Sequence, residues 1–254
     1  MKSKSNQLRK SEEKLQKYLA NSGFTTRRNI KNFLAQNTVT KSNKKLKAES
    51  LVYDNDCLTI SGEDHIVDLN PELEILIYHK DVGQICSNTA TDNKETVFSK
   101  IPPRKKGKWI MVGRLDINTS GLLLFTNNGD FSNKLSHPSS NIDREYLCRV
   151  YGEVTDSKLS KLLKGIKIQN ETSNFSDIVA VKKQGKSKNQ WFYVCLFTGK
   201  NREVRKLWKS QGLIVNRLIR VRYGSILLPE SLKASGWKKL STKEIKKLKN
   251  TYKI

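Results

Sequence analysis

A short apolar run behind a glycine-bounded polar loop constrains this chain more than any other stretch. Leu122–Phe125 has the length and composition of a buried strand, and the turn residues Asn127–Asp130 end it. The loop Gly113–Gly121 comes directly before this run, with Asp116 two residues after Arg114. A carboxylate on a loop that a buried strand anchors is a typical binding or catalytic residue. An aspartate that only caps a turn is the alternative.

The same loop also matches the start of a calcium-binding EF-hand loop. Asp116, Asn118, Ser120 and Gly121 stand at its first, third, fifth and sixth positions. The twelfth position is Asn127 in place of the bidentate glutamate, and a strand-like run replaces the second helix. We therefore predict no metal in this loop.

The charge of the chain indicates a polyanionic partner. The 254 residues include 48 Lys and Arg against 24 Asp and Glu, a formal net charge of +24. No apolar run approaches the roughly 20 residues that cross a bilayer. Residues 1–10 are polar and basic, with no apolar segment behind them as in a secretory signal. We predict a cytoplasmic protein that binds nucleic acid and not membrane.

The cysteines and histidines show no metal-ligand spacing. There is no Cys-x-x-Cys pair, and no histidine stands at a metal-ligand spacing from a cysteine. The pattern predicts no zinc site and buried thiols in a reducing compartment. These residues are Cys57, Cys86, Cys148, Cys195, His65, His79 and His137.

The N-terminal part of the chain is expected to form a small domain of its own. After a disordered basic arm, residues 1–10, apolar residues recur at helical spacing in two short segments. We expect the first helix to open at Glu12 and Glu13, and Thr25 or Thr26 to cap the second. This domain would span residues 11–62, a linker residues 63–71 and the main domain residues 72–254.

Two short helices followed by a small hairpin resemble the αL RNA-binding domain. That domain occurs in a small-subunit ribosomal protein, in tyrosyl-tRNA synthetases and in RNA-modifying enzymes. The match rests on Lys14–Ala20, Ser22–Gly23 and Thr26–Arg28. A basic helical hairpin that only keeps the chain in solution is the alternative. The RNA contacts that the resemblance implies are Arg27, Arg28 and Lys31.

The main domain mixes strands and helices without a regular β-α-β alternation. Arg144–Tyr151 alternates as a half-buried strand does, and Trp191–Leu196 reads as a buried strand. Ser157–Lys164 has the periodicity of an amphipathic helix. This mixture predicts an α+β fold with a mainly antiparallel sheet.

Several spaced segments together resemble the RsuA/RluB/RluE/RluF family of ribosomal-RNA pseudouridine synthases. They are Gly113–Gly121, Arg144–Tyr146, Gly199–Leu207 and Arg217–Gly224. The resemblance extends over residues 12–248 and is closest to the RluB members. It implies the pseudouridine synthase fold behind the αL domain, and a uridine of 23S ribosomal RNA as the substrate.

The resemblance also implies roles for individual residues. Asp116 would be the aspartate on which the chemistry depends, and Arg205 would pair with it. Tyr146 would stack on a uracil flipped out of the RNA, and Arg114 would enter the RNA beside the target. From residue type alone, Tyr146 could be a core residue and Arg205 a phosphate contact. The remaining substrate-binding residues expected are Arg202, Arg220 and Arg222.

The reaction needs no cofactor, because it only rearranges the substrate. The N1–C1′ bond breaks, the ring turns, and C5 joins C1′ without oxidation or an imported group. An ionised carboxylate can attack the sugar carbon or remove a sugar proton, and the sequence leaves both open. The partner is expected to be ribosomal RNA, free or in an assembling large subunit, and the protein a monomer. The alternatives are a non-catalytic ribosome-assembly factor, an enzyme for another rRNA uridine, and a DNA-binding protein without a clear recognition helix.

Overall fold

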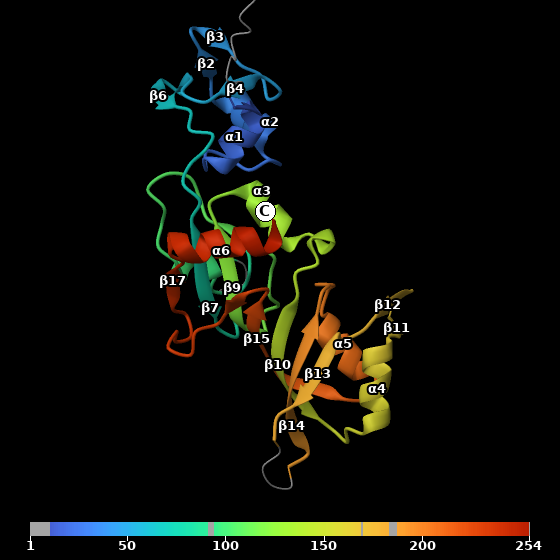
Figure 1. The fold of residues 1–254 in the computed structure, drawn as a ribbon. Coiled ribbons are helices and arrows are strands. Elements are labelled where there is room, and N and C mark those ends of the chain that lie inside the picture. The colour runs from blue at the N-terminus through green and yellow to red at the C-terminus, as the bar shows by residue number, and fades with distance from the viewer. Residues whose placement is uncertain (1–10, 91–93, 169, 183–186, 254) are drawn as a thin grey trace, which may run out of the picture. The chain divides into compact units, whose positions relative to one another are not determined.

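The computed structural model describes residues 11–90, 94–168, 170–182 and 187–253 (Figure 1). The chain divides into two compact units. The first reaches Leu73 and includes Pro103–Trp109, and the second consists of Glu74–Pro102 and everything from Ile110 onward. The expected basic arm, residues 1–10, lies outside the described residues.

The first unit packs two short helices against small antiparallel strands. One sheet has the order β3-β2-β5-β6, and a second consists of β1 and β4. Leu15 and Leu19 of the first helix are fully buried together with Val52 and Leu58 of the strands. The elements are β1 Glu12–Lys14, α1 Leu15–Asn21, α2 Ile30–Gln36, β2 Val39–Lys41, β3 Lys44–Lys45, β4 Leu51–Tyr53, β5 Cys57–Ile60 and β6 Glu63–Ile66.

The starts of both helices differ from the expectation. Glu12–Lys14 is a strand, because it pairs with Leu51–Tyr53, and α1 begins only after it. The second helix has Asn29 as its N-cap residue in place of Thr25 or Thr26. The periodicity of apolar residues therefore located the helices but not their first turns.

Part of the expected linker belongs to the first unit. Glu63–Ile66 pairs with Cys57–Ile60, and Val67 is fully buried in the core. The strand β6 lies at the edge of its sheet and is mostly exposed, so it carries the polar residues that edge strands commonly have. That composition made the segment look like a linker.

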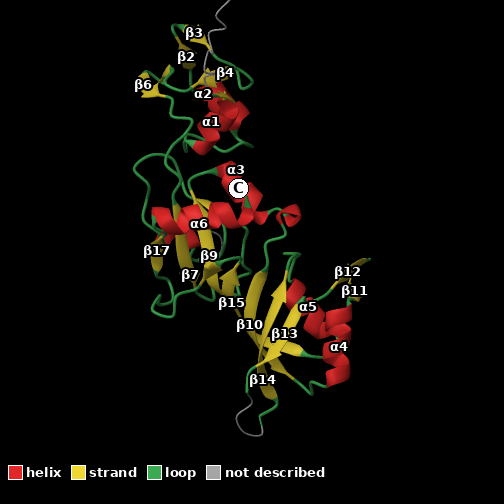
Figure 2. Ribbon diagram, in the orientation of Figure 1, coloured by secondary structure: helices red, strands yellow, loops and turns green. Residues whose placement is uncertain are grey.

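The second unit is built on a nine-stranded sheet, drawn in yellow in Figure 2. Its main path is β13-β14-β10-β15-β9-β7-β17, with β16 paired to β15 and β8 paired to β9. All pairings in it are antiparallel except that of β15 with β9. The α+β class with a mostly antiparallel sheet is thus confirmed. The strands are β7 Ile75–Lys80, β8 Ile110–Val112, β9 Ser120–Thr126, β10 Arg144–Tyr151, β13 Asp177–Ala180, β14 Asn189–Leu196, β15 Ile214–Tyr223, β16 Ile226–Leu227 and β17 Trp237–Lys239, with β11 Ile166–Ile168 and β12 Glu171–Ser173 in a separate hairpin.

The apolar run Leu122–Phe125 forms the middle of β9, as expected. All four of its side chains have no exposed surface, and β9 is flanked by β7 and β15. Burying a leucine or phenylalanine side chain contributes about 1.5–3 kcal/mol. The strand therefore gives the preceding loop a rigid attachment in the centre of the sheet.

Helices pack around this sheet, and one of them, α4 Asp156–Lys164, lies where the periodicity of Ser157–Lys164 indicated a helix. Trp208 of α5 packs on Phe192 of β14, with ring centroids 5.1 Å apart, and on Phe175. Ser241 and Glu244 form a capping box at the start of the last helix. None of the helices in the described part of the chain has both the length and the apolar character that a membrane crossing requires. The helices are η1 Val97–Lys100, α3 Gly129–Ser136, η2 Pro138–Ser140, α4 Asp156–Lys164, α5 Glu203–Ser210 and α6 Thr242–Tyr252.

Candidate active site

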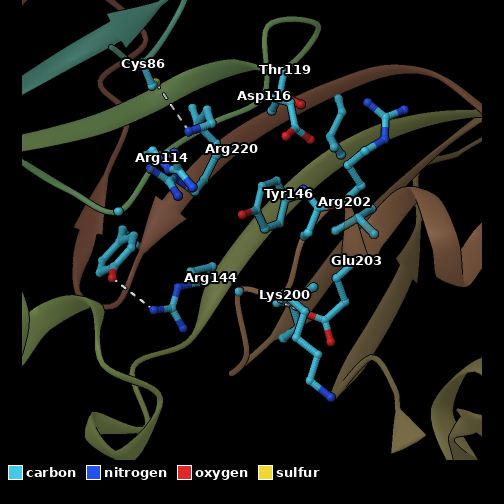
Figure 3. A pocket seen from close by; sticks show the side chains of 18 of the residues that line it. Cys86, Arg114, Asp116, Thr119, Arg144, Tyr146, Lys200, Arg202, Glu203 and Arg220 are labelled. Carbon is cyan, nitrogen blue, oxygen red and sulfur yellow. Dashed lines mark hydrogen bonds between the residues drawn. The ribbon is translucent and has the colours of Figure 1, made fainter. Parts of the chain in front are cut away.

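A cavity of about 550 Å³ opens in the second unit, beside the loop before β9. Figure 3 shows the side chains of Asp116 and Tyr146 projecting into this space, with Arg220 and Arg202 on either side of Tyr146. Arg114, at the start of the loop, also lines it. Residues that are far apart in the sequence are thus gathered in one pocket with a positive charge excess.

The polar loop is a turn held by a buried lysine. The backbone N–H of Thr119 donates to the carbonyl of Asp116 at 3.0 Å. Lys80, at the end of β7, has no exposed surface. Its Nζ donates to the carbonyls of Thr119 at 2.8 Å, Asp81 at 2.9 Å and Asp116 at 3.1 Å. Burial lowers the pKa of Lys80, opposed by the charges of Cys86, Asp81 and Asp116. The ammonium therefore fixes the turn through its main chain.

Arg205 supports the same loop from α5. Its guanidinium donates to the carbonyl of Asn118 at 2.8 Å and to that of Val215 at 2.6 Å. The expected ion pair with Asp116 is not formed among the described residues. Burial lowers the pKa of Arg205, and the nearby Asp116 charge acts in the opposite direction. Arg205 thus holds the loop beside the aspartate through the backbone.

These backbone contacts leave the aspartate side chain free. Within the described residues, the carboxylate of Asp116 has no hydrogen-bond partner, whereas its carbonyl accepts from Thr119 and Lys80. The side chain is half-buried at the wall of the cavity. A carboxylate placed in this way is available to a bound ligand, and its loop is already ordered.

The opposite wall of the cavity follows from strand pairing. Gly121 of β9 pairs with Arg220 of β15, and Arg220 pairs in turn with Tyr146 of β10. Gly121 has φ of +103°, and a Cβ there would collide with the backbone of Arg220. Only glycine fits this close approach. The three residues form one row across the sheet, which places Tyr146 in the pocket of the Asp116 loop.

A bulge separates two arginines that look equivalent in the sequence. The register shifts between Glu145 and Tyr146, so Arg222 pairs with Glu145 and Arg220 with Tyr146. Arg222 then forms ion pairs with Asp143 at 2.5 Å and with Glu145 at 2.7 Å. The expectation that Arg222 binds substrate is therefore not supported, because two carboxylates already neutralise it.

Arg220, by contrast, is buried in the pocket wall and has an N–H donor without a partner. It is 3% exposed, and its Nε donates to the carbonyl of Leu122 at 2.7 Å. Its Nη2 is buried without a hydrogen-bond partner. The neighbouring Arg144 is also buried, but it donates to carbonyl groups and to the hydroxyl of Tyr223. The hydrogen bonds that offset the burial of the Arg144 guanidinium are therefore incomplete for Arg220.

The loop before α5 closes the cavity and is shaped by Glu203. The buried carboxylate of Glu203 accepts from the hydroxyl of Thr198 at 2.7 Å and from the backbone N–H of Lys200 at 3.1 Å. Arg202 has a left-handed backbone there and is exposed. Glu203 thus serves its own loop, and this leaves Asp116 as the free carboxylate in the described pocket lining.

The structure brings most of the expected site residues together. Arg114, Asp116, Tyr146, Arg202 and Arg220 line the cavity. Arg205 lies behind the loop, in contact with its backbone. Arg27, Arg28 and Lys31 are exposed on the first unit.

Three residues of the site were missed in the sequence. Lys80 ends an apolar strand, and a lysine at a strand end is usually exposed to solvent. Its position directly after a run of buried apolar residues was the one sign in the sequence that it is buried. Arg144 alternates with apolar residues on the buried face of β10. Glu203 sits between basic residues with nothing in the spacing to distinguish it.

The residues that the structure describes include no group of side chains that could coordinate a metal ion. No three His, Cys, Asp or Glu side chains are grouped there as a metal site would need. The chemistry of the pocket is that of one carboxylate, one phenol ring and several guanidinium groups.

Comparisons with known proteins agree with this geometry. The family model described as RNA pseudouridylate synthase matches residues 74–210. The chain is 40% identical to the ribosomal large subunit pseudouridine synthase B of Vibrio cholerae serotype O1, over 93% of this chain and 74% of that protein. The protein of the same name from Buchnera aphidicola is 39% identical, over 94% of this chain and 96% of its own length. A solved structure described as a pseudouridylate synthase shares the fold, with a TM-score of 0.63 at 22% identity over 92% of this chain and 99% of that one. The chain belongs to the RNA pseudouridylate synthase family.

Proposed function

We propose that this protein converts a uridine of large-subunit ribosomal RNA to pseudouridine, with Asp116 as the essential carboxylate. The observation that carries the proposal is the free carboxylate on an ordered turn in a cationic pocket. The substrate class rests on relatives named ribosomal large subunit pseudouridine synthase B. The rearrangement imports no group and changes no oxidation state, so residues of this kind are sufficient.

Asp116 acts on the sugar of the target nucleotide. As a nucleophile it would attack C1′, and as a base it would take a sugar proton; both routes need an ionised carboxylate with no competing partner. The turn that Lys80 and Arg205 hold supplies this arrangement. Positioning of this kind lowers the entropy cost of reaching the transition state.

Tyr146 and Arg114 handle the flipped nucleotide. A base inside a stem hides C1′, so the nucleotide has to leave the stack. The ring of Tyr146 lines the cavity and is 9% exposed, which suits stacking on an extruded uracil. Arg114 is exposed at the rim, where it can enter the RNA in place of the base.

Arg220 receives a phosphate of the bound RNA. A buried guanidinium with an unpartnered donor is costly unless an anion pairs with it. Phosphate matches guanidinium geometry and is what an RNA strand would bring into the cavity. Arg202, exposed at the cavity, adds to the attraction.

The first unit binds RNA as an αL-type domain. Its helices α1 and α2 and its small sheets are the elements that the resemblance implies. Arg27, Arg28 and Lys31 are exposed on it and can reach phosphates. We place the reaction in the cytoplasm, on 23S rRNA alone or in an assembling particle, and expect a monomer.

Mapping of pseudouridines in ribosomal RNA tests the function directly. RNA from cells with and without this protein is compared, and a single large-subunit position is expected to lose its pseudouridine. A lost position in other RNA would instead indicate a family member with another target. An unchanged map, with RNA binding retained, would favour the non-catalytic assembly factor.

A further inference from the structure

The helices leave one face of the sheet open over β13, β14, β10 and the adjoining part of β15, whereas β9 is buried on both faces. Trp208 of α5 packs on Phe192, so α5 covers the face on which Phe192 lies. Residues that alternate with Phe192 lie on the opposite face, and Tyr193 there is 38% exposed. In Figure 1, α4 and α5 lie together on one side of β13 and β14.

The strand register assembles three rows of side chains on this open face. Directly opposed residues of paired strands share a face. The first row is Val179, Tyr193, Leu147 and Ile219, the second is Trp191, Arg149 and Arg217, and the third is Asn189, Tyr151 and Ile214.

This face combines exposed aromatic and aliphatic groups. Ile214 is 58% exposed, Val179 51% and Tyr151 41%. A contiguous exposed patch of this kind on a protein usually marks an interaction surface. Tyr146, Leu218 and Arg220, which line the catalytic cavity, lie on the other face of the same strands, so the patch is separate from that cavity.

The cations on the face have no acidic partners. Arg149 lies over the ring of Trp191 at 5.9 Å, and its Nε is buried without a hydrogen-bond partner. Neither Arg149 nor Arg217 forms an ion pair within the described residues. Two carboxylates share the face: Glu145 is already paired with Arg222, and Asp177 lies in the same row on β13, away from Arg149 and Arg217. The surface thus offers free positive charge beside aromatic rings.

We propose that this open face binds unpaired nucleotides of the RNA substrate, away from the catalytic cavity. Bases stack on Trp191, Tyr193 and Tyr151, and the phosphates contact Arg149 and Arg217. A sheet that presents aromatic rings between basic side chains is a common platform for single-stranded RNA. This inference rests on the proposed function, because it takes RNA as the ligand.

Charge argues against a second copy of this chain as the occupant of the face. A second copy would place the same cations against one another. A polyanion is attracted to all of these groups, and its bases can cover the aromatic rings.

The test compares two matched double variants of the full-length protein. Tyr193→Ala with Arg217→Gln removes one aromatic ring and one charge from the open face. Lys161→Gln with Leu163→Ala removes one charge and one exposed apolar side chain from α4. All four positions are exposed, so the melting temperature of each variant should stay near that of the wild type.

The probe is a fluorescein-labelled 12-nucleotide oligouridylate, titrated by fluorescence anisotropy at low salt. The open-face variant should bind at least about five-fold more weakly than the wild type, the change that one stacking contact gives. The α4 variant should match the wild type. Ultraviolet cross-linking should attach the RNA to the peptide that contains Trp191 and Tyr193.

Equal affinity of the two variants would overturn the inference, as would cross-links confined to the catalytic cavity. Dimerisation of the wild type in light scattering, lost in the open-face variant, would show a second copy on this surface and also overturn it. Pseudouridine formation by the wild-type protein reports separately on the proposed function. A protein that binds the oligouridylate here but forms no pseudouridine would refute the function alone.

Discussion

Replacement of Asp116 by asparagine separates an enzyme from an RNA binder. Asparagine is nearly isosteric with aspartate and removes only the charge. The carbonyl of Asp116 accepts from Thr119 and Lys80, and this main-chain group is unchanged in Asp116→Asn. The carboxylate itself has no hydrogen-bond partner in the described residues. The structure therefore predicts a change in unfolding free energy within about 0.5 kcal/mol.

The expected loss of activity is much larger. A carboxylate that acts as a base contributes about 10²–10⁴-fold to the rate, and a nucleophile contributes more. Asp116→Asn should therefore lower the single-turnover rate of pseudouridine formation by at least about a hundred-fold. RNA affinity should stay the same or rise slightly, because a negative charge facing phosphate is gone.

The assay measures pseudouridine yield, RNA affinity and melting temperature on the same sample. Asp156→Asn is the matched control, since Asp156 is an exposed carboxylate on α4 outside the cavity lining. It should keep wild-type activity. A folded Asp116→Asn protein with full activity would refute the catalytic assignment, together with the roles of its neighbours Tyr146 and Arg205.

Three further predictions concern buried groups. Lys80→Met should lower the free energy of unfolding by about 1–3 kcal/mol for each loop carbonyl left without a donor. Part of this loss is offset because an ammonium group is no longer buried. Chemical denaturation measures the change, and an unchanged midpoint would contradict the role of Lys80. Arg220→Gln should raise KM for RNA about ten-fold with little net change in thermal stability, because the lost hydrogen bond to the Leu122 carbonyl is offset by no longer burying an unpaired charge. An unchanged KM would remove Arg220 from the binding site. Burial raises the pKa of Cys148 to about 12, so its thiol should resist a disulfide reagent at pH 8 in the native state, whereas the exposed Cys57 reacts. The unfolded chain loses the Cys148 proton near pH 9 and the folded one near pH 12, so this thiol lowers stability as the pH rises between those values; equal reaction rates of the two thiols would contradict its burial.

The sequence predicted the parts of the fold that local pattern determines. Leu122–Phe125 became a buried strand because an apolar run of that length has few alternatives, and the Asp116 loop before it followed. Ser157–Lys164 lies within α4, since its apolar residues recur at helical spacing. Edge strands such as Glu63–Ile66 carry no such pattern, because their polar residues face solvent on both sides.

The site was less predictable wherever long-range pairing decides a residue's role. Arg220 and Arg222 stand two apart in a strand, and alternation alone puts them on one face. The bulge beside Tyr146 turns them to opposite faces, one into the cavity and one toward Glu145. A bulge depends on the register of two strands, which no local pattern contains. Lys80 was missed for the same reason, because two of the carbonyls that it binds, those of Asp116 and Thr119, come from a loop 36 to 39 residues away.

Lys80 and Arg205 hold the Asp116 loop without an ion pair between Arg205 and Asp116. A salt bridge would fix the carboxylate, but the substrate would have to displace it before the carboxylate could act. Lys80 and Arg205 instead bind the carbonyls of the turn, so the loop is ordered while its side chain stays free. Backbone anchoring thus combines a preorganised position with an accessible reactive group, which is what a reaction on a bound nucleotide requires.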